Sequence, residues 1–274
     1  MENGKVFFKI VIPNYNNGTW IKRCLDSMFA QTFKDFAVVV VDDCSTDESY
    51  ELAVGYRKKH DNIFCLRLSE KGFQSTARNV GFEYPIDSEY VIFFDGDDWL
   101  YDNKVLADIH DELLRKPVDM LVGQYVNVFN GRMQLGRKQK FDLKSDNFFD
   151  NNGFYCWVRF VKSDKVVKFP EKLGAGEDVY QYFMQCDNVV SYRFTDRIIT
   201  CHNKMDRDSV MSVGSYKNTI RNICQFDYFC KLALLLKEKK IRNVHIRRWV
   251  WAEMMLYGSR MKDFINNMRQ ENYI

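Results

Sequence analysis

The sequence has few prolines, no closely spaced cysteine pair and no apolar run long enough to cross a bilayer. Only four of its 274 residues are proline, and no segment is repetitive or low in complexity, which excludes disordered, collagen-like and repeat proteins. Eight cysteines occur without a Cys-x-x-Cys spacing, which argues against zinc sites and disulfide frameworks. With 46% hydrophobic residues the chain can bury a large core, and we expect the cysteines to serve there as small apolar residues in a reducing cytoplasm.

The N-terminal apolar run does not have the form of a targeting or membrane segment. Lys9 interrupts Val6–Ile12 and Pro13 follows it, so the run predicts a buried strand. No other apolar run approaches the ~20 residues that a transmembrane helix needs. We therefore expect a cytoplasmic protein whose only route to the bilayer is peripheral contact at the inner face of the membrane.

Positive charge is concentrated towards residue 274. Residues 211–274 hold twelve Lys and Arg against five Asp and Glu, whereas the whole chain has a net charge of only +3. The pattern predicts two helices, at about 217–236 and 241–268, with aromatic residues between the charges. Such a segment suits an anionic membrane surface, but we favour a helical extension with a solvated basic face. No nucleic-acid-binding motif accompanies the charge, so we expect no nucleic-acid partner.

Residues 1–100 alternate apolar runs with helical periodicity, as an α/β sheet does. The apolar runs are continuous, which is typical of parallel strands covered on both faces. Ser45 and Glu48 form a capping-box pattern, which predicts that a helix begins there. No element is predicted in the polar stretch that reaches about Asn152. The elements expected elsewhere are strands at 7–12, 36–41, 63–68 and 90–94, a helix near 103–114 and a strand near 120–127.

Three carboxylates, those of Asp95, Asp97 and Asp98, directly follow a buried strand of the predicted sheet. Their mutual repulsion would raise their pKa values unless a cation is present. Hard divalent ions such as Mg²⁺ and Mn²⁺ prefer oxygen ligands and commonly bridge a protein carboxylate to a diphosphate. An acidic turn or helix cap would explain the cluster as well.

Polar residues also follow the first two predicted strands, namely Tyr15 after the first and the pair Asp42 and Asp43 after the second. The carboxyl ends of parallel strands meet at one edge of a sheet, where ligands collect. A carboxylate there can accept hydrogen bonds from a nucleobase or from ribose hydroxyls, and Tyr15 could stack on the base. An ordinary turn aspartate and a packing tyrosine are the structural alternatives.

Four motifs in this order resemble the family 2 glycosyltransferases of the GT-A fold. They are Ile10–Asn16, Gln31–Phe36 leading to Val41–Asp47, Ser75–Gly81 and Phe93–Asp98. The resemblance covers residues 5–210 and implies an α/β GT-A fold with a mostly parallel central sheet flanked by helices. It divides the chain into a nucleotide-binding half at 1–100, an acceptor-binding half at 101–210 and a helical extension at 211–274. Cys44 stands where the family usually has glycine.

The resemblance also implies roles for single residues. The nucleotide-binding residues would be Pro13, Tyr15, Asp42, Asp43, Arg78 and Asp95. Among them, Tyr15 and Asp43 would hold the uracil. Asp95 and Asp97 would form the Asp-x-Asp element that binds ribose and the metal-bound diphosphate, with Mn²⁺ or Mg²⁺ as the cofactor. Arg78 would steady the nucleotide or the diphosphate with its forked guanidinium, for which a surface ion pair is the alternative.

Gly174–Tyr180 resembles the Glu-Asp element of the family, in which Asp178 would be the catalytic base. The reaction needs such a carboxylate, separate from those on the metal, because a sugar hydroxyl must lose its proton. By themselves, Glu177 and Asp178 could simply open a helix. In some relatives a histidine near the end of the core completes the metal site, which makes His202 a candidate ligand and a structural histidine the alternative.

The sequence thus predicts an inverting glycosyltransferase that moves a hexose or amino-hexose from a UDP-sugar to a hydroxyl of a glycan or lipid-linked acceptor. A second copy of the chain is a candidate partner. An inactive sugar-nucleotide-binding protein is the non-enzymatic alternative. A haloacid dehalogenase-type phosphatase is disfavoured because its nucleophilic aspartate usually lies on the first strand. A nucleotidyltransferase is disfavoured because Asn14–Asn17 is neither glycine-rich nor basic.

Overall fold

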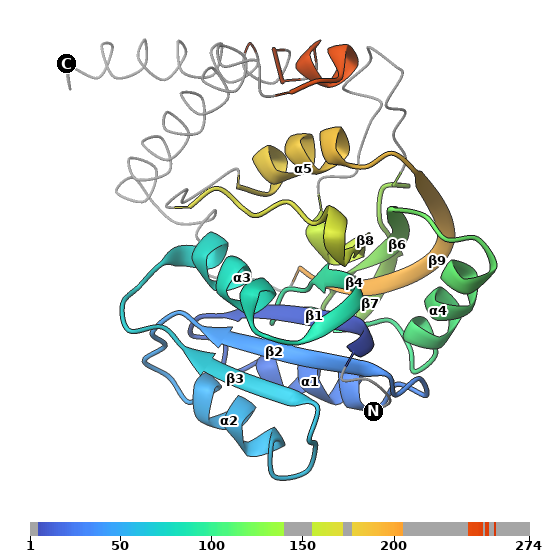
Figure 1. Ribbon diagram of the computed structural model, residues 1–274. Coiled ribbons are helices and arrows are strands. Elements are labelled where there is room, and N and C mark those ends of the chain that lie inside the picture. The colour runs from blue at the N-terminus through green and yellow to red at the C-terminus, as the bar shows by residue number, and fades with distance from the viewer. Residues whose placement is uncertain are drawn as a thin grey trace, which may run out of the picture.

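The computed structural model describes residues 5–139, 155–171, 177–204, 241–248, 250–251 and 255, which form an α/β structure around a nine-stranded sheet (Figure 1). The strands lie in the order β3-β2-β1-β4-β8-β6-β9-β5, and β7 pairs with β6. Most of the two helices predicted for the basic extension, and its boundary at 211, lie outside these ranges, although residues 244–248 are helical. No helix in the described ranges is long and apolar enough to cross a membrane.

The helices of the described ranges lie on both faces of the sheet. They are α1 (Ile21–Phe29), α2 (Ser49–Tyr56), α3 (Phe73–Glu83), α4 (Val105–Arg115) and α5 (Glu177–Asn188), with the short 3₁₀ helices η2 (Cys156–Val158) and η3 (Ser163–Lys165). Figure 1 shows α3 and α5 on one side of the sheet and α1 and α2 on the other.

The first four strands are parallel, as the continuous apolar runs predict. These strands are β1 (Lys5–Asn14), β2 (Phe36–Asp42), β3 (Ile63–Arg67) and β4 (Asp87–Phe93). Every residue of β2 is buried, and its side chains alternate between two apolar clusters. Val38 and Val40 belong to the main core, whereas Val39 and Val41 cluster with Ala77 of α3. Both faces of the strand are therefore covered.

The second half of the sheet is mixed rather than parallel. Its strands are β5 (Trp99–Leu100), β6 (Met120–Phe129), β7 (Arg132–Leu135), β8 (Arg159–Lys162) and β9 (Tyr192–Asn203). β8 is antiparallel to both β4 and β6, β9 is parallel to β6, and β5 is antiparallel to β9. The mostly parallel order that we predict therefore applies to the first four strands. Strands β5, β7, β8 and β9 were not predicted. The partners of β5, β8 and β9 lie far away in the sequence, and all four residues of β7 are exposed, so that strand has no apolar pattern of its own.

The capping-box prediction at Ser45 is wrong. α2 begins at Ser49, and its N-cap residue is Glu48, whose side chain makes no capping hydrogen bond. The Ser45 hydroxyl donates instead to the carboxylate of Asp42, and Asp47 accepts a hydrogen bond from the Ser49 backbone nitrogen at 3.1 Å. The Ser45 hydroxyl, which the sequence pattern assigns to the helix, is thus hydrogen-bonded to the buried Asp42.

Cys44 adopts a left-handed backbone conformation, with φ of +61°. Residues with a side chain rarely take this conformation because Cβ approaches the following carbonyl oxygen, whereas glycine takes it freely. The thiol of Cys44 donates to the Leu68 carbonyl oxygen at 3.2 Å. The backbone of this turn therefore explains why the family that the sequence resembles usually has glycine here.

Candidate active site

The loops after β1, β2 and β4 meet at the carboxyl edge of the parallel strands. Asn14 and Asp42 are partners in the register of β1 and β2, and the Asp43 nitrogen donates to the Asn14 carbonyl at 2.8 Å. A Cβ added to Gly96 would lie 2.9 Å from the side-chain nitrogen of Asn17, so the acidic loop lies closely against the loop after β1. The structure thus brings the three strand ends together, as the sequence predicts.

Asp42 is completely buried within this edge. Its Oδ1 accepts hydrogen bonds from Asn14 Nδ2 at 2.7 Å and from the Ser45 hydroxyl, and its Oδ2 accepts one from the Ser45 nitrogen at 3.0 Å. Arg67 Nε lies 3.3 Å from Asp42 Oδ2. The geometry favours a carboxylate that organises the turn from inside over the direct nucleotide contact that the resemblance implies. Pro13, at the same edge, is partly exposed.

Tyr15 and Asp43 lie against the segment that leads into α3. Tyr15 is 44% exposed, and Lys71 Nζ lies 3.6 Å from the centroid of its ring. Asp43 accepts hydrogen bonds from the backbone nitrogens of Gly72 at 2.6 Å and Phe73 at 3.0 Å. Since each carboxylate oxygen can accept more than one hydrogen bond, Asp43 can still receive an N–H group of a nucleobase.

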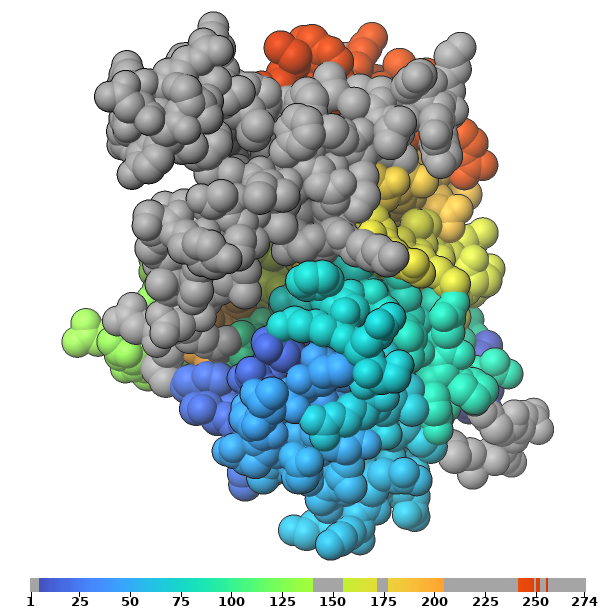
Figure 2. Space-filling view, turned by 90° about the vertical axis from the view of Figure 1, so that its left-hand side faces the viewer, coloured from blue at the N-terminus to red at the C-terminus, as the bar shows by residue number. Residues whose placement is uncertain are grey.

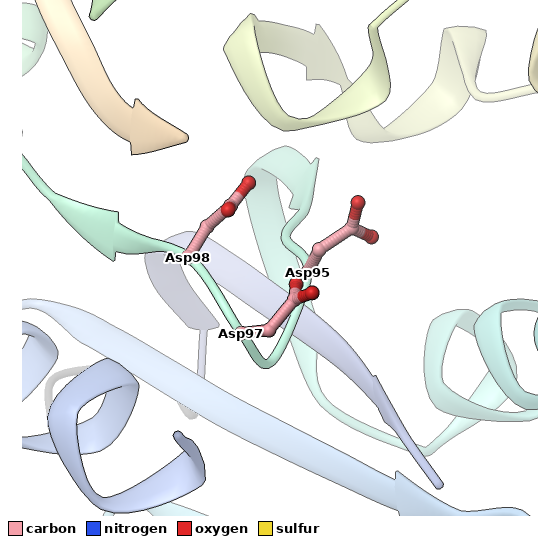
Figure 3. Close-up of side chains that lie close together, drawn as sticks. All are labelled: Asp95, Asp97 and Asp98. Atoms are coloured by element: carbon pink, nitrogen blue, oxygen red, sulfur yellow. The ribbon is translucent and has the colours of Figure 1, made fainter. Parts of the chain in front are cut away.

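The acidic loop between β4 and β5 holds a group of three carboxylates, shown in Figure 3. Asp95, Asp97 and Asp98 each offer an oxygen that lies within 4.8 Å of the other two. Asp95 and Asp97 are partly exposed, whereas Asp98 is buried. This set of hard oxygen donors fits a Mg²⁺ or Mn²⁺ ion, with Asp95 and Asp97 as the ligands that a diphosphate could also reach.

Asp98 connects the acidic loop to β9. Its carboxylate accepts a hydrogen bond from the Asn203 nitrogen at 2.9 Å and lies 3.1 Å from His202 Nδ1. Burial raises the pKa of Asp98, while the interaction with His202 lowers it. The His202 ring stacks on Trp157 with 4.8 Å between centroids. His202 is therefore a partner of Asp98 through Nδ1, and its role as a metal ligand stays a prediction.

Arg78 joins the acidic loop to the start of α5. Its side chain is only 1% exposed, and Nη2 lies 2.8 Å from Asp95 Oδ1. Nη1 lies 3.1 Å from Asp178 Oδ1 and 3.4 Å from Glu177 Oε1. Burial acts to lower the pKa of Arg78, but the acidic groups of Cys156, Asp178, Asp95 and Glu177 hold it well above its ordinary value. The arginine is thus a permanent buried cation between two sets of carboxylates.

The two carboxylates that begin α5 both have raised pKa values. Burial raises the pKa of Glu177 to about 7, Asp178 acts in the same direction, and Arg78 opposes the shift. Burial also raises the pKa of Asp178, while Arg78 lowers it. The thiol of Cys156 donates to Asp178 Oδ1 at 3.8 Å. A carboxylate whose pKa lies above its ordinary range holds a proton more readily, which suits the base that the sequence predicts at Asp178.

Sequence reasoning missed two residues that support this network, Cys156 and Asn79. Asn79 exchanges two hydrogen bonds with the backbone of Phe169, donating to its carbonyl at 3.0 Å and accepting from its nitrogen at 2.9 Å. Asn79 follows Arg78 in the motif Ser75–Gly81, so the sequence drew attention to this segment. It did not indicate that Asn79 bonds to the backbone of Phe169. Cys156 had no local signal, because an isolated cysteine beside apolar residues is typical of any core.

Comparison with solved structures identifies the class of fold. A crystal structure of TarS residues 1–349 from S. aureus in complex with UDP-GlcNAc has a TM-score of 0.71 and 22% identity, and covers 92% of this chain and 72% of that one. The UDP complex has a TM-score of 0.61 and 26% identity, over 72% of this chain and 60% of that one. A Pyrobaculum calidifontis mannosyltransferase in complex with GDP-Man and Mn²⁺ has a TM-score of 0.60 and 14% identity, over 98% and 76%. The protein has the GT-A fold, as predicted.

The family model described as Glycosyl transferase family 2 matches residues 9–172. The match spans more than half of the chain and contains all four motifs, and the chain therefore belongs to glycosyltransferase family 2.

Curated relatives resemble part of the chain. The poly(ribitol-phosphate) beta-N-acetylglucosaminyltransferase TarS of Staphylococcus aureus (strain Mu50) is 35% identical over 179 residues, which are 62% of this chain and 31% of TarS. Glycosyltransferase GlyG of Streptococcus pneumoniae serotype 4 is 28% identical over 118 residues, which are 43% of this chain and 38% of GlyG. The chain spans well under half the length of either relative.

Proposed function

We propose that this chain transfers a hexose or N-acetylhexosamine from a UDP-sugar to a hydroxyl of a glycan or lipid-linked acceptor, with inversion at the anomeric carbon and with a divalent cation. The observation that carries the proposal is the meeting of Asp95 and Asp178 on the two terminal nitrogens of Arg78. A candidate metal-diphosphate ligand on the loop after β4 and a candidate base at the start of α5 thus contact the same guanidinium. The family membership and the UDP-GlcNAc complex of TarS support the same class of reaction.

Each residue of the donor side has a defined task in this proposal. Tyr15 offers an exposed ring to the uracil, and Asp43 offers a carboxylate to its imide N–H. Asp95 and Asp97 would hold Mn²⁺ or Mg²⁺, which when bound neutralises charge on the departing diphosphate.

The acceptor side uses Asp178 as the base. The carboxylate takes the proton of the acceptor hydroxyl while its oxygen forms a bond to C1 of the sugar. The bond from C1 to the diphosphate oxygen breaks on the opposite face, and UDP leaves with the electron pair. The proton then passes from Asp178 to water. A single displacement of this kind inverts the configuration at C1.

We also propose a cytoplasmic site of action, at or near the inner face of the membrane. Supporting it, the six cysteines of the described residues are free, among them the partly exposed Cys44 and Cys65, as in a reducing compartment. The proposed donor class is a second support. A transferase must act in a compartment where its UDP-sugar is present, and we place both in the cytoplasm.

The test of the proposal combines donor binding with turnover. UDP-glucose, UDP-galactose, UDP-GlcNAc and UDP-GalNAc are screened by thermal shift with and without Mn²⁺, and donor hydrolysis is measured for each one that binds. We expect at least one UDP-sugar to stabilise the protein only with metal and to be slowly hydrolysed. Binding of UDP without hydrolysis or transfer would favour the inactive sugar-nucleotide-binding protein instead.

The matching variant is Asp97→Asn, with Asp61→Asn as the control on an exposed loop. We expect Asp97→Asn to lower metal-dependent turnover by about 100-fold or more, because a metal ligand supplies several kcal/mol of charge stabilisation. Its melting temperature should stay close to that of the wild type, since the side chain is partly exposed. Asp61→Asn should leave both quantities unchanged. Wild-type turnover in Asp97→Asn would refute the metal assignment.

A further inference from the structure

Arg78 contacts both functional sides of the proposed active site from inside the protein. It lies on α3, and its guanidinium bonds to Asp95 on the acidic loop and to Asp178 at the start of α5, which are 17 and 100 residues away in the sequence. In Figure 2 the teal surface, which includes α3, lies between the blue surface of N-terminal residues and the yellow surface that includes residues 155–171. The arginine therefore stands where the two halves of the site meet.

The arginine is firmly held. A Cβ added to Gly81 of the same helix would lie only 2.5 Å from Val11 Cγ1, so α3 packs closely on β1. The guanidinium carbon lies 4.9 Å from the centroid of the Phe169 ring. Asn79, the next residue, holds the backbone of Phe169 by two hydrogen bonds. A side chain fixed in this way can serve as a reference point for the groups that bond to it.

The planar guanidinium suits this place better than any other cation. Its two terminal nitrogens point in fixed directions, so one can bind Asp95 while the other binds Asp178. A lysine has one nitrogen on a flexible chain and cannot reproduce the separation of the two contacts. Because the arginine is buried and both terminal nitrogens face carboxylates, it is poorly placed to contact a nucleotide.

We propose that Arg78 is a positioning residue that fixes the base Asp178 relative to the donor-binding carboxylate Asp95, and that it does not bind the nucleotide itself. This role rests on the proposed function, in which Asp178 is the base and Asp95 is a metal ligand. It departs from the contact with nucleotide or diphosphate that the sequence motif suggests for this arginine.

The test compares Arg78→Lys with Arg197→Lys. Arg197 forms ion pairs with two carboxylates as well, those of Asp102 at 2.5 Å and Asp108 at 2.9 Å, on a different part of the molecule. It is therefore the control for an arginine that bridges two carboxylates away from the site. Calorimetry gives the Kd for UDP with Mn²⁺, and steady-state assays give kcat for hydrolysis and transfer at saturating donor. We expect Arg78→Lys to lower kcat by about 100-fold, as a misplaced catalytic group does. The Kd for UDP should change less than about threefold, because Arg78 makes no contact with the nucleotide in this proposal. A change of that size is no larger than the effect of losing one weak surface ion pair.

A second readout is the pH dependence of kcat in Arg78→Gln. The groups that face Asp178 are Arg78 from α3, Asp95 from the acidic loop, Arg159 from β8, Cys156 from η2 and Glu177 beside it. Removing the positive charge of Arg78 leaves the carboxylates to raise the proton affinity of Asp178 further. The acidic limb of the profile should therefore move to higher pH, which a merely structural defect would not cause. If Arg78→Gln does not fold, Arg78→Lys, which keeps the charge, carries the test.

The outcomes separate two kinds of failure. A large rise in the Kd for UDP with an unchanged kcat in Arg78→Lys would show that Arg78 binds the nucleotide, and would overturn the positioning role alone. Wild-type kcat and Kd in Arg78→Lys would overturn it too. A wild-type protein that neither transfers nor hydrolyses any UDP-sugar would overturn the proposed function, and the positioning role with it.

Discussion

Glu177 and Asp178 are neighbouring carboxylates whose surroundings differ at the scale of single side chains. Asp178 lies 3.1 Å from Nη1 of Arg78, whereas Glu177 lies 3.4 Å from the same nitrogen. Asp178 also accepts a hydrogen bond from the Cys156 thiol. Burial raises the pKa of Glu177 from its ordinary 4.5 to about 7. Glu177 therefore takes up a proton within the physiological range, close to the proposed base.

The raised pKa of Glu177 predicts how stability depends on pH. Between pH 4.5 and pH 7 the folded state binds more protons than the unfolded state, so stability falls as pH rises through this window. Glu177→Gln lacks this titration and can still accept a hydrogen bond from Arg78. We expect its melting temperature, relative to the wild type, to be higher at pH 8 than at pH 5. Thermal melts across this range measure it.

The control for this prediction is Glu70→Gln, at an exposed position. Its melting temperature relative to the wild type should show no such change between pH 5 and pH 8. A constant difference for Glu177→Gln as well would contradict the assignment of a raised pKa to this carboxyl.

At the scale of single elements, α3 organises the candidate site more than any other helix of the described ranges. The amides at its start bind Asp43, its middle carries Arg78 and Asn79, and its later part packs on β1 through Gly81. The residues that we propose for the donor side and for the acceptor side thus both contact this one helix. Its position against the sheet should therefore affect both stability and turnover.

The close packing of α3 gives a prediction with an internal control. Gly81→Ala would place a Cβ 2.5 Å from Val11 Cγ1, whereas a Cβ at Gly55 of α2 meets nothing within 4 Å. We expect Gly81→Ala to destabilise the protein by about 1–3 kcal/mol through overpacking. Gly55→Ala should stabilise it by about 0.5–1 kcal/mol, because alanine favours a helix more than glycine does. Urea unfolding measures both, and equal midpoints for the two variants would contradict the packing argument.

At the scale of the whole molecule, two buried contacts connect the halves of the sheet near the site. The strands themselves meet at β4 and β8, where the paired residues are Tyr90 with Lys162 and Val91 with Val161. The bond between Asp98 and Asn203 connects the acidic loop to β9, and Arg78 connects it to α5. The halves are therefore joined at the point where we propose that donor and acceptor meet.

The link through Asp98 can be tested by Asp98→Asn. The amide keeps the shape of the side chain, and its oxygen can still accept from the Asn203 nitrogen. The amide is neutral, however, and its NH₂ group replaces Oδ2, the second oxygen that lies 3.1 Å from His202 Nδ1. The variant therefore loses a charge-assisted contact. We expect a loss of about 1–3 kcal/mol in unfolding free energy. Mn²⁺ affinity should fall by roughly 10-fold, as for other residues that orient metal ligands. Asp61→Asn is again the control, and unchanged values for Asp98→Asn would show that this link is dispensable.

The sequence by itself predicted the residues that we propose for the donor side of the site. Continuous apolar runs predict the parallel strands, and the polar residues that follow them, Tyr15, Asp43, Asp95 and Asp97, reach one edge because parallel strands end together. The Gly-Glu-Asp segment also marked Asp178, although only through its resemblance to a family. Local periodicity carries this information because strand direction and strand ends follow from short segments of chain.

Only the tertiary structure decided how these residues pair. Asp42 is buried in the fold, and the Ser45 hydroxyl donates to its carboxylate instead of capping a helix. Arg78 lies between Asp95 and Asp178. The tertiary structure also set His202 against Asp98 across 104 residues of sequence. Contacts over such separations depend on the packing of the whole chain, and no local pattern encodes them. For that reason the sequence identified the acidic cluster and the pair Asp95 and Asp97 within it, while the structure supplied the partners of the buried Asp98, namely His202 and Asn203.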